Sequence, residues 1–234
     1  MTIAANLFAI QKRIARAAQR AGRSSQEVKL MAVTKTVSAE QIIEAYAAGQ
    51  RLFGENRVQE FAEKWGALQA LQGADFHMIG HLQSNKAAKA AELFQSIDSL
   101  DSAKLGERLN AAGEKLDKTL SVLIEINVGG EEAKSGVALD SLELERIFSA
   151  APAWPHLRVE GLMTVPPFTE DPEGARPYFW KLRALRDRTA ARKMPSIRLD
   201  VLSMGMSHDF EVAIAEGSTC VRIGTAIFGE RPKP

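Results

Sequence analysis

The chain has 234 residues, of which 45% are hydrophobic and 25% are charged, a composition typical of a globular protein and unlike that of a disordered one. Its 30 basic and 29 acidic residues nearly cancel, which argues against partners such as nucleic acid or an acidic membrane surface. The single cysteine, Cys220, excludes an internal disulfide and a cysteine-rich zinc site, and no apolar stretch approaches the roughly 20 residues that span a bilayer. We therefore expect a cytoplasmic protein that binds no metal and folds as a single domain over residues 1–234.

The N-terminal segment combines an apolar stripe with a run of basic residues. Apolar residues at helical spacing predict an amphipathic helix that packs on the domain, namely Leu7, Ile10, Ile14, Ala17 and Ala21. The basic residues before the first acidic one, Glu27, are Lys12, Arg13, Arg16, Arg20 and Arg23. Such a run is also typical of an organellar transit peptide, which is the alternative interpretation. We favour the structural helix.

From Lys29 onward, apolar runs of strand length alternate with helical patterns, which predicts parallel strands joined by helices. The candidate strands are Leu30–Lys35, Arg51–Glu55, Phe76–Gly80, Leu93–Ile97, Leu120–Val128, Val159–Val165, Ile197–Ser203 and Cys220–Gly224. Eight strands favour closure into a (β/α)8 TIM barrel, an α/β fold, here with an extra N-terminal helix. An open doubly wound sheet is the alternative. However, the sequence has no G-x-G-x-x-G motif and no P-loop, and its nearest segment, Gly130–Ser135, lacks the glycine before Lys134.

The first βα unit carries clear local signals. Ser38 and Gln41 predict a capping box for a helix over Ala39–Ala48, and Gly49 stands where a C-terminal cap belongs. In a parallel barrel the functional side chains gather at the carboxyl ends of the strands, so candidate site residues are sought there.

Lys35 closes the first predicted strand, on the same face as Met31 and Val33. Burial among apolar neighbours lowers the pKa of a lysine, and the neutral amine is the form that attacks an aldehyde. The alternative is a strand-end lysine that reaches into solvent. Lys35 is thus a candidate Schiff-base residue that needs support from the rest of the site.

Residues at the last two predicted strands indicate an anion site. Arg222 lies between apolar residues in a strand suited to burial, so it needs a partner, either a structural ion pair or a ligand. Gly224 and Thr225 follow directly, in the loop where barrels often bind phosphate. Ser207 is a suitable N-cap for a helix over about residues 208–216, whose first N–H groups also suit an anion. An amine at strand one and an anion site at strands seven and eight match an aldehyde phosphate.

Five segments, in this order along the chain, together resemble one family. They are Ala32-Val33-Thr34-Lys35, Phe53-Gly54-Glu55-Asn56, His77-Met78-Ile79-Gly80-His81-Leu82-Gln83-Ser84-Asn85-Lys86, Leu202-Ser203-Met204-Gly205-Met206-Ser207 and Val221-Arg222-Ile223-Gly224-Thr225. The family is the pyridoxal phosphate homeostasis proteins, and the resemblance extends from the N-terminal helix through Gly229. It implies a single barrel similar to the N-terminal domain of alanine racemase.

The resemblance also implies roles for individual residues. Lys35 would carry pyridoxal 5'-phosphate (PLP) as an internal aldimine, and Arg222 would face the pyridine nitrogen. The residues implied to hold the phosphate are Ser207, Gly224 and Thr225. Asn56, His81 and Met163 match positions near the cofactor, although His81 also fits a loop histidine that forms only local hydrogen bonds.

These roles favour cofactor binding over catalysis. An arginine can only donate to the ring nitrogen, which leaves that nitrogen unprotonated and weakens the electron sink that amino-acid chemistry on PLP requires. Racemisation needs an acid or base on each face of the substrate carbon, and Lys35 serves only one face. Tyr46 and Tyr178 are the only phenols, and both lie in predicted helices where packing is the better interpretation.

We therefore expect a protein that binds PLP reversibly and releases it to enzymes that need it, without robust catalysis and with apo forms of PLP-dependent enzymes as partners. A weak PLP-dependent racemase or lyase is one alternative. Another is a barrel enzyme in which Lys35 forms a Schiff base with a phosphorylated substrate, as in aldolases. We expect a monomer, because the resemblance covers only the barrel of the racemases and not the second domain that helps them form dimers.

Overall fold

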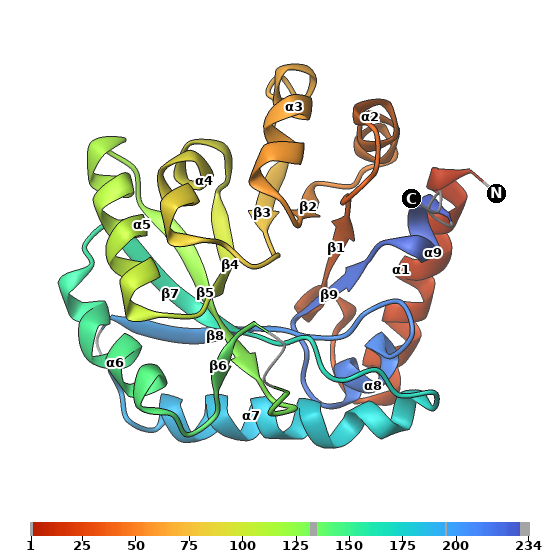
Figure 1. Cartoon of the computed structure of the whole chain (residues 1–234). Coiled ribbons are helices and arrows are strands. Elements are labelled where there is room, and N and C mark those ends of the chain that lie inside the picture. The colour runs from red at the N-terminus through yellow and green to blue at the C-terminus, as the bar shows by residue number, and fades with distance from the viewer. Residues whose placement is uncertain (1, 132–134, 195, 230–234) are drawn as a thin grey trace.

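The computed structural model describes residues 2–131, 135–194 and 196–229, and its centre is a closed barrel of parallel strands (Figure 1). The barrel strands within these residues are β1 (Lys29–Val33), β2 (Leu52–Glu55), β3 (Asp75–Met78), β4 (Ser96–Leu100), β5 (Leu120–Asn127), β7 (Leu157–Met163), β8 (Ile197–Ser203) and β9 (Cys220–Ile223). Each barrel strand pairs with the next barrel strand along the chain, including β4 with β5. The pairing of β9 with β1 closes the ring. The TIM-barrel prediction is confirmed, and the open doubly wound alternative is excluded.

Helices separate the strands and form the outer layer of the barrel (Figure 1). Their bounds are α1 (Ile3–Arg20), α2 (Ala39–Ala47), α3 (Val58–Leu68), α4 (Ala87–Leu93), α5 (Ala103–Lys115), α6 (Leu142–Ala150), α7 (Arg176–Ala190), α8 (Phe210–Ala215) and α9 (Thr225–Phe228). A two-residue strand, β6 (Val137–Ala138), pairs with the end of β5 and was not predicted. The predicted capping box of Ser38 and Gln41 is present at α2, and Gly49 follows that helix at a φ of 99°. No helix in the described part of the chain is both long and apolar enough to cross a bilayer.

The helix α1 packs against α8 and α9 near the C-terminal end of the described chain, and all three lie on the same side of the barrel (Figure 1). Its buried face consists of Ile3, Leu7, Ile10, Ile14, Ala17 and Ala18. Polar contacts join it to α8 and α9: Asn6 Nδ2 donates to the carbonyl of Ile227 at 2.8 Å, and Arg13 pairs with Glu211 at 3.2 Å. The predicted amphipathic helix is therefore an integral part of the fold.

An aromatic cluster fills the space between the β2–β3 side of the barrel and α3. Phe61 contacts Phe76 and Phe94 at ring-centroid distances of 4.9 and 4.7 Å, and Phe53 stacks on Phe76 at 5.2 Å. These four rings are fully buried. Because aromatic pairs add to the free energy of burial, this cluster fixes α3 against the strands. Its position matters for the site, since α3 lies directly behind the turn that follows β1.

The structure corrects two expectations about local structure. The fourth strand was predicted over Leu93–Ile97, but α4 extends through Leu93 and the strand is Ser96–Leu100. A short apolar run does not distinguish the end of a buried helix from the start of a strand. Ser207 is not a helix N-cap, because α8 begins at Phe210 and is preceded by Asp209. The other seven strands lie within two residues of their predicted bounds. Lys134, which entered the P-loop comparison, lies outside the described residues.

Candidate functional site

A cavity of about 340 Å³ opens at the carboxyl ends of the strands, the end where TIM barrels place their functional side chains. The described residues that line it are Val33, Lys35, Asn56, Ile79, Val165, Met206, Ser207, His208, Arg222, Gly224 and Thr225. They come from β1, β9 and the segments that follow β1, β2, β3, β7, β8 and β9. The fold therefore brings together groups that lie up to 192 positions apart in the sequence, from Val33 to Thr225.

Six of the eight predicted site residues line this cavity, and two do not. The six are Lys35, Asn56, Ser207, Arg222, Gly224 and Thr225. Met163 is fully buried at the end of β7. The side chain of His81 is 57% exposed, and its Nδ1 lies 3.1 Å from the carboxylate of Asp101. His81 thus makes the local hydrogen bond that was weighed as its alternative role.

Lys35 lies in a tight turn and not in the strand that was predicted to contain it. β1 ends at Val33, and the N–H of Val37 donates to the carbonyl of Thr34 at 3.0 Å. Thr36 has a φ of 62°, in the left-handed region that a β-branched residue rarely adopts. Lys35 is partly buried and lines the cavity beside Val33. The turn therefore carries the lysine from the strand end into the mouth of the barrel.

Arg222 is a buried cation in the cavity wall, only 4% exposed. Its Nη1 donates to the Ser203 hydroxyl at 2.8 Å and its Nη2 donates to the carbonyl of Thr164 at 2.7 Å. Burial lowers the pKa of the guanidinium, and anionic groups farther away, such as Asp98 and Glu125, oppose this effect. Because both hydrogen bonds go to neutral oxygens, the positive charge is held in place without an adjacent carboxylate. Such a charge favours a ligand that is anionic or accepts a hydrogen bond.

The loops after β8 and β9 form another part of the cavity wall. Gly205 has a φ of 96°, and a Cβ atom there would lie 2.6 Å from the Cβ of Ala213, so the turn after β8 requires glycine. The N–H of Met206 donates to the carboxylate of Asp209 at 2.6 Å, which shapes the segment that contains Ser207. Gly224 and Thr225 lie where β9 ends and α9 begins. Ser207, Gly224 and Thr225 of these two loops border the same space as Lys35.

Sequence reasoning missed five lining residues, four of which carry no chemical signal. They are Val33, Ile79, Val165, Met206 and His208. His208 is exposed, and its Nε2 lies 3.1 and 3.0 Å from the carbonyls of Thr169 and Glu170. Its ring centroid lies 5.5 Å from that of Phe168. A histidine directly after Ser207, the serine predicted to hold a phosphate, was a signal that the sequence did contain.

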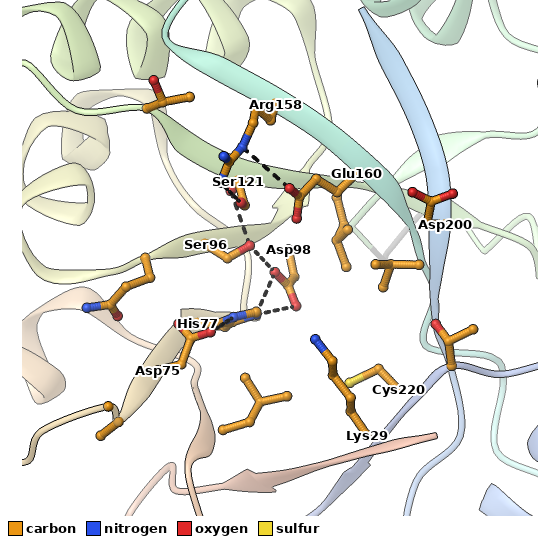
Figure 2. A pocket seen from close by; sticks show the side chains of 18 of the residues that line it. Lys29, Asp75, His77, Ser96, Asp98, Ser121, Arg158, Glu160, Asp200 and Cys220 are labelled. Atoms are coloured by element: carbon orange, nitrogen blue, oxygen red, sulfur yellow. Dashed lines mark hydrogen bonds and ion pairs between the residues drawn. The ribbon is translucent and has the colours of Figure 1, made fainter. Parts of the chain in front are cut away.

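A larger cavity, of about 840 Å³, lies at the amino ends of the strands (Figure 2). Figure 2 shows the His77 side chain between Asp75 and Asp98, whose carboxylates lie 3.2 and 3.1 Å from its ring nitrogens. Burial disfavours the charged imidazole, but the two carboxylates outweigh this effect and raise the pKa of His77 to about 10. The Ser96 hydroxyl donates to Asp98 at 2.7 Å. At this end of a TIM barrel such networks are associated with stability, and we assign this cluster a structural role.

Two further observations limit the chemistry that the described residues can support. Burial raises the pKa of the Cys220 thiol to about 12, so the thiolate that would act as a nucleophile is not formed near neutral pH. Across residues 2–131, 135–194 and 196–229, no group of three or more His, Cys, Asp or Glu is arranged to hold a metal ion.

A parallel barrel whose strand-end cavity contains a lysine after the first strand and small or hydroxyl-bearing residues after the last two defines a class of cofactor-binding domains, and sequence comparison identifies the family. The family model "Alanine racemase, N-terminal domain" matches residues 5–232, so the chain belongs to that family. Within it, the chain groups with the pyridoxal phosphate homeostasis proteins. It is 46% identical to the protein of that name from Aquifex aeolicus, over 99% of each chain.

Solved structures agree with this assignment. The chain is similar to PipY of Synechococcus elongatus, solved with PLP bound, with a TM-score of 0.81 and 34% identity over 97% of this chain and 100% of the other. It also matches alanine racemase from Streptomyces coelicolor with a TM-score of 0.73 and 20% identity, over 99% of this chain but 60% of the racemase. At that identity the racemase shows the shared fold alone.

Proposed function

We propose that this protein binds PLP as a Schiff base on Lys35 and carries it for intracellular PLP homeostasis, without robust catalysis. The observation that carries the proposal is the arrangement of one cavity, in which Lys35 and the buried guanidinium of Arg222 lie with the loops that contain Ser207 and Thr225. Family membership and the PLP bound to PipY support the choice of cofactor. When bound, PLP supplies a reactive aldehyde that condenses with an amine.

The residues that line the cavity fit PLP. A volume of about 340 Å³ lies at the lower end of the range for small-ligand pockets, as a single substituted ring requires. The hydroxyls of Ser207 and Thr225 would donate to the phosphate, and the small Gly224 would let the backbone approach it. Arg222 would donate to the ring nitrogen, which could then stay unprotonated. Asn56 contributes an amide to the cavity wall, while Met163 and His81 stay predictions as cofactor neighbours.

The same arrangement explains why we propose a carrier. None of the described residues that line the cavity is a carboxylate, and a carboxylate near the ring nitrogen is what favours the protonated, electron-withdrawing form of the cofactor. Tyr46 donates its hydroxyl to the carbonyl of Gln72 at 2.8 Å, and Tyr178 lies on α7, so neither is among the described lining residues. We further propose that the protein acts in the cytoplasm as a monomer and delivers PLP to apo forms of PLP-dependent enzymes.

Visible absorption of the purified protein with added PLP tests the proposal. We expect a Schiff-base band that is absent in Lys35→Ala and retained in Lys29→Ala, a matched change at a lysine of the amino-end cavity. Borohydride reduction followed by peptide mapping should place the cofactor on the peptide that contains Lys35. The absence of a band in the wild type would refute PLP binding and favour the aldolase-like alternative. A band with rapid amino-acid racemisation would favour the weak-enzyme alternative.

A further inference from the structure

A buried polar cluster lies directly behind the turn that carries Lys35. At its centre is the Nζ of Lys64, on α3, whose side chain is 12% exposed. This ammonium lies 3.1 Å from the Oε1 of Glu55, 2.9 Å from the Oε1 of Glu60 and 3.2 Å from the carbonyl of Thr34. The three oxygens belong to β2, α3 and the turn after β1, so one lysine joins three segments. Its three N–H donors match the three acceptors.

The cluster holds the backbone on both sides of Lys35. Before the lysine, the Thr34 hydroxyl donates to Glu55 at 2.7 Å, and the Thr34 carbonyl accepts from Lys64. After it, the N–H of Thr36 donates to Glu60 at 2.5 Å. Thr36 has a φ of 62°, a left-handed conformation that a β-branched residue rarely adopts. Hydrogen bonds to charged groups are among the strongest in proteins and can hold such a conformation.

We propose that Lys64 is a positioning residue for the PLP-binding lysine: by pairing with Glu55 and Glu60 it fixes the turn Thr34–Val37 and so sets the direction in which Lys35 enters the cavity. This inference rests on the proposed function, because it assumes that Lys35 is the point of attachment. Lys64 itself is not among the described residues that line the cavity, so it acts through the turn and not by contact with the cofactor.

The direction of the Lys35 side chain matters because its amine must reach the aldehyde carbon of PLP. The neutral amine of Lys35 adds to the aldehyde carbon, the C=O bond becomes a C=N bond, and the carbonyl oxygen leaves as water with the two amine protons. A bound aldehyde and a fixed amine react as one molecule, with a large effective concentration that is lost when the amine is misdirected. We call the contacts of Lys64 with Glu55, Glu60 and the Thr34 carbonyl the clamp. Loss of the clamp should therefore weaken the covalent step more than the recognition of the phosphate and the ring.

The test compares two ligands. PLP binds covalently, whereas pyridoxine 5'-phosphate has the same ring and phosphate but no aldehyde, so it reports only non-covalent recognition. In Lys64→Met we expect the Kd for PLP to rise about tenfold or more, and the Kd for pyridoxine 5'-phosphate to change by less than about threefold. Lys89→Met, which removes a surface lysine paired with Glu92, is the matched control and should leave both constants unchanged.

A second variant separates the positioning effect from a loss of folding stability. Lys64→Met leaves the fully buried carboxylate of Glu55 without its cation, whereas Glu55→Gln combined with Lys64→Met removes both charges. The double variant should be the more stable of the two and should show the same selective loss of PLP affinity. In the cofactor-free protein, amide hydrogen exchange at Thr36 should become faster in both variants, which reports the clamp directly.

The outcomes separate this inference from the proposed function. Wild-type PLP affinity in the folded variants, or an equal loss for both ligands, would overturn the positioning role and leave PLP binding by Lys35 intact. A selective loss for PLP together with faster exchange at Thr36 supports it. If the wild type forms no Schiff base with PLP at all, the proposed function fails first, and the positioning role fails with it.

Discussion

His77 makes the stability of the barrel depend on pH in a way that can be calculated. Burial opposes its charged form, but Asp98 and Asp75 overcome this and raise its pKa from 6.5 to about 10. His77 therefore keeps a proton in the folded state that it loses in the unfolded state above a pH of about 6.5. The stabilisation is fully present below a pH of about 6.5 and is lost as the pH rises toward 10.

The magnitude follows from the difference in bound protons. Between these two pKa values the free energy of unfolding falls by about 1.4 kcal/mol per pH unit for one proton. From about pH 7 to about pH 8.5 the loss is therefore about 2 kcal/mol. Above about pH 8.5 a second contribution grows, because Cys220, whose pKa in the folded state is about 12, has an unfolded thiol that is half ionised near pH 9.

Urea unfolding of the wild type and of His77→Gln at several pH values between 7 and 8.5 measures this effect. Glutamine can still donate to the carboxylates but does not titrate, so it removes the proton linkage and keeps a polar group in place. We expect the wild-type free energy of unfolding to fall with pH more steeply than that of the variant, by about 1.4 kcal/mol per unit. Equal slopes would show that the imidazole carries no extra proton in the folded state and would refute the reasoning.

Further predictions concern packing, and urea unfolding at constant pH checks each of them. Gly66→Ala should raise the free energy of unfolding by about 0.5–1 kcal/mol, because a Cβ atom in that helix meets open space; a decrease would contradict this. Gly161→Ala should lower it by more than about 2 kcal/mol, because the new Cβ would lie 2.0 Å from the carbonyl of Val201 on the adjacent strand. Ile10→Ala should cost about 2–5 kcal/mol, while Phe8→Ala on the exposed face of the same helix should change the value by less than about 0.5 kcal/mol. Similar values for these last two variants would show that α1 does not pack as described.

The order of strands and helices could be predicted because periodicity is a local property of the sequence. Strand ends were less certain where helix and strand signals overlap, as at Leu93, which closes α4 although it begins an apolar run. Ser207 was predicted as the cap of the helix after β8, but the N-cap residue is Asp209, whose carboxylate accepts a hydrogen bond from the N–H of Met206. Such choices depend on the three-dimensional path of the loop, which a linear pattern does not contain.

The candidate site was predictable where residues carry unusual chemistry for their place in a strand. Lys35 and Arg222 are charged residues at or within apolar strands, so they stood out, whereas Ile79 and Val165 resemble any other apolar residue. The clamp was hidden for a different reason. Glu60 and Lys64 are four residues apart on a helix, a spacing typical of a solvent-exposed pair. Only the burial of Glu55 beside them shows that the pair faces the turn.

Burial is unequal across the cavity, and this bears on how a carrier can both hold and release its cofactor. Arg222 is 4% exposed and is fixed by Ser203 and the Thr164 carbonyl, so the electrostatic anchor is rigid. Lys35 is only partly buried and Thr225 is exposed, so under the proposed function the covalent link and the phosphate would lie nearer to solvent than Arg222 does. Release of PLP requires water to attack the C=N bond, and an enzyme that protects a reactive intermediate keeps water out. A buried Arg222 beside a partly buried Lys35 therefore fits the proposed reversible exchange better than protected turnover.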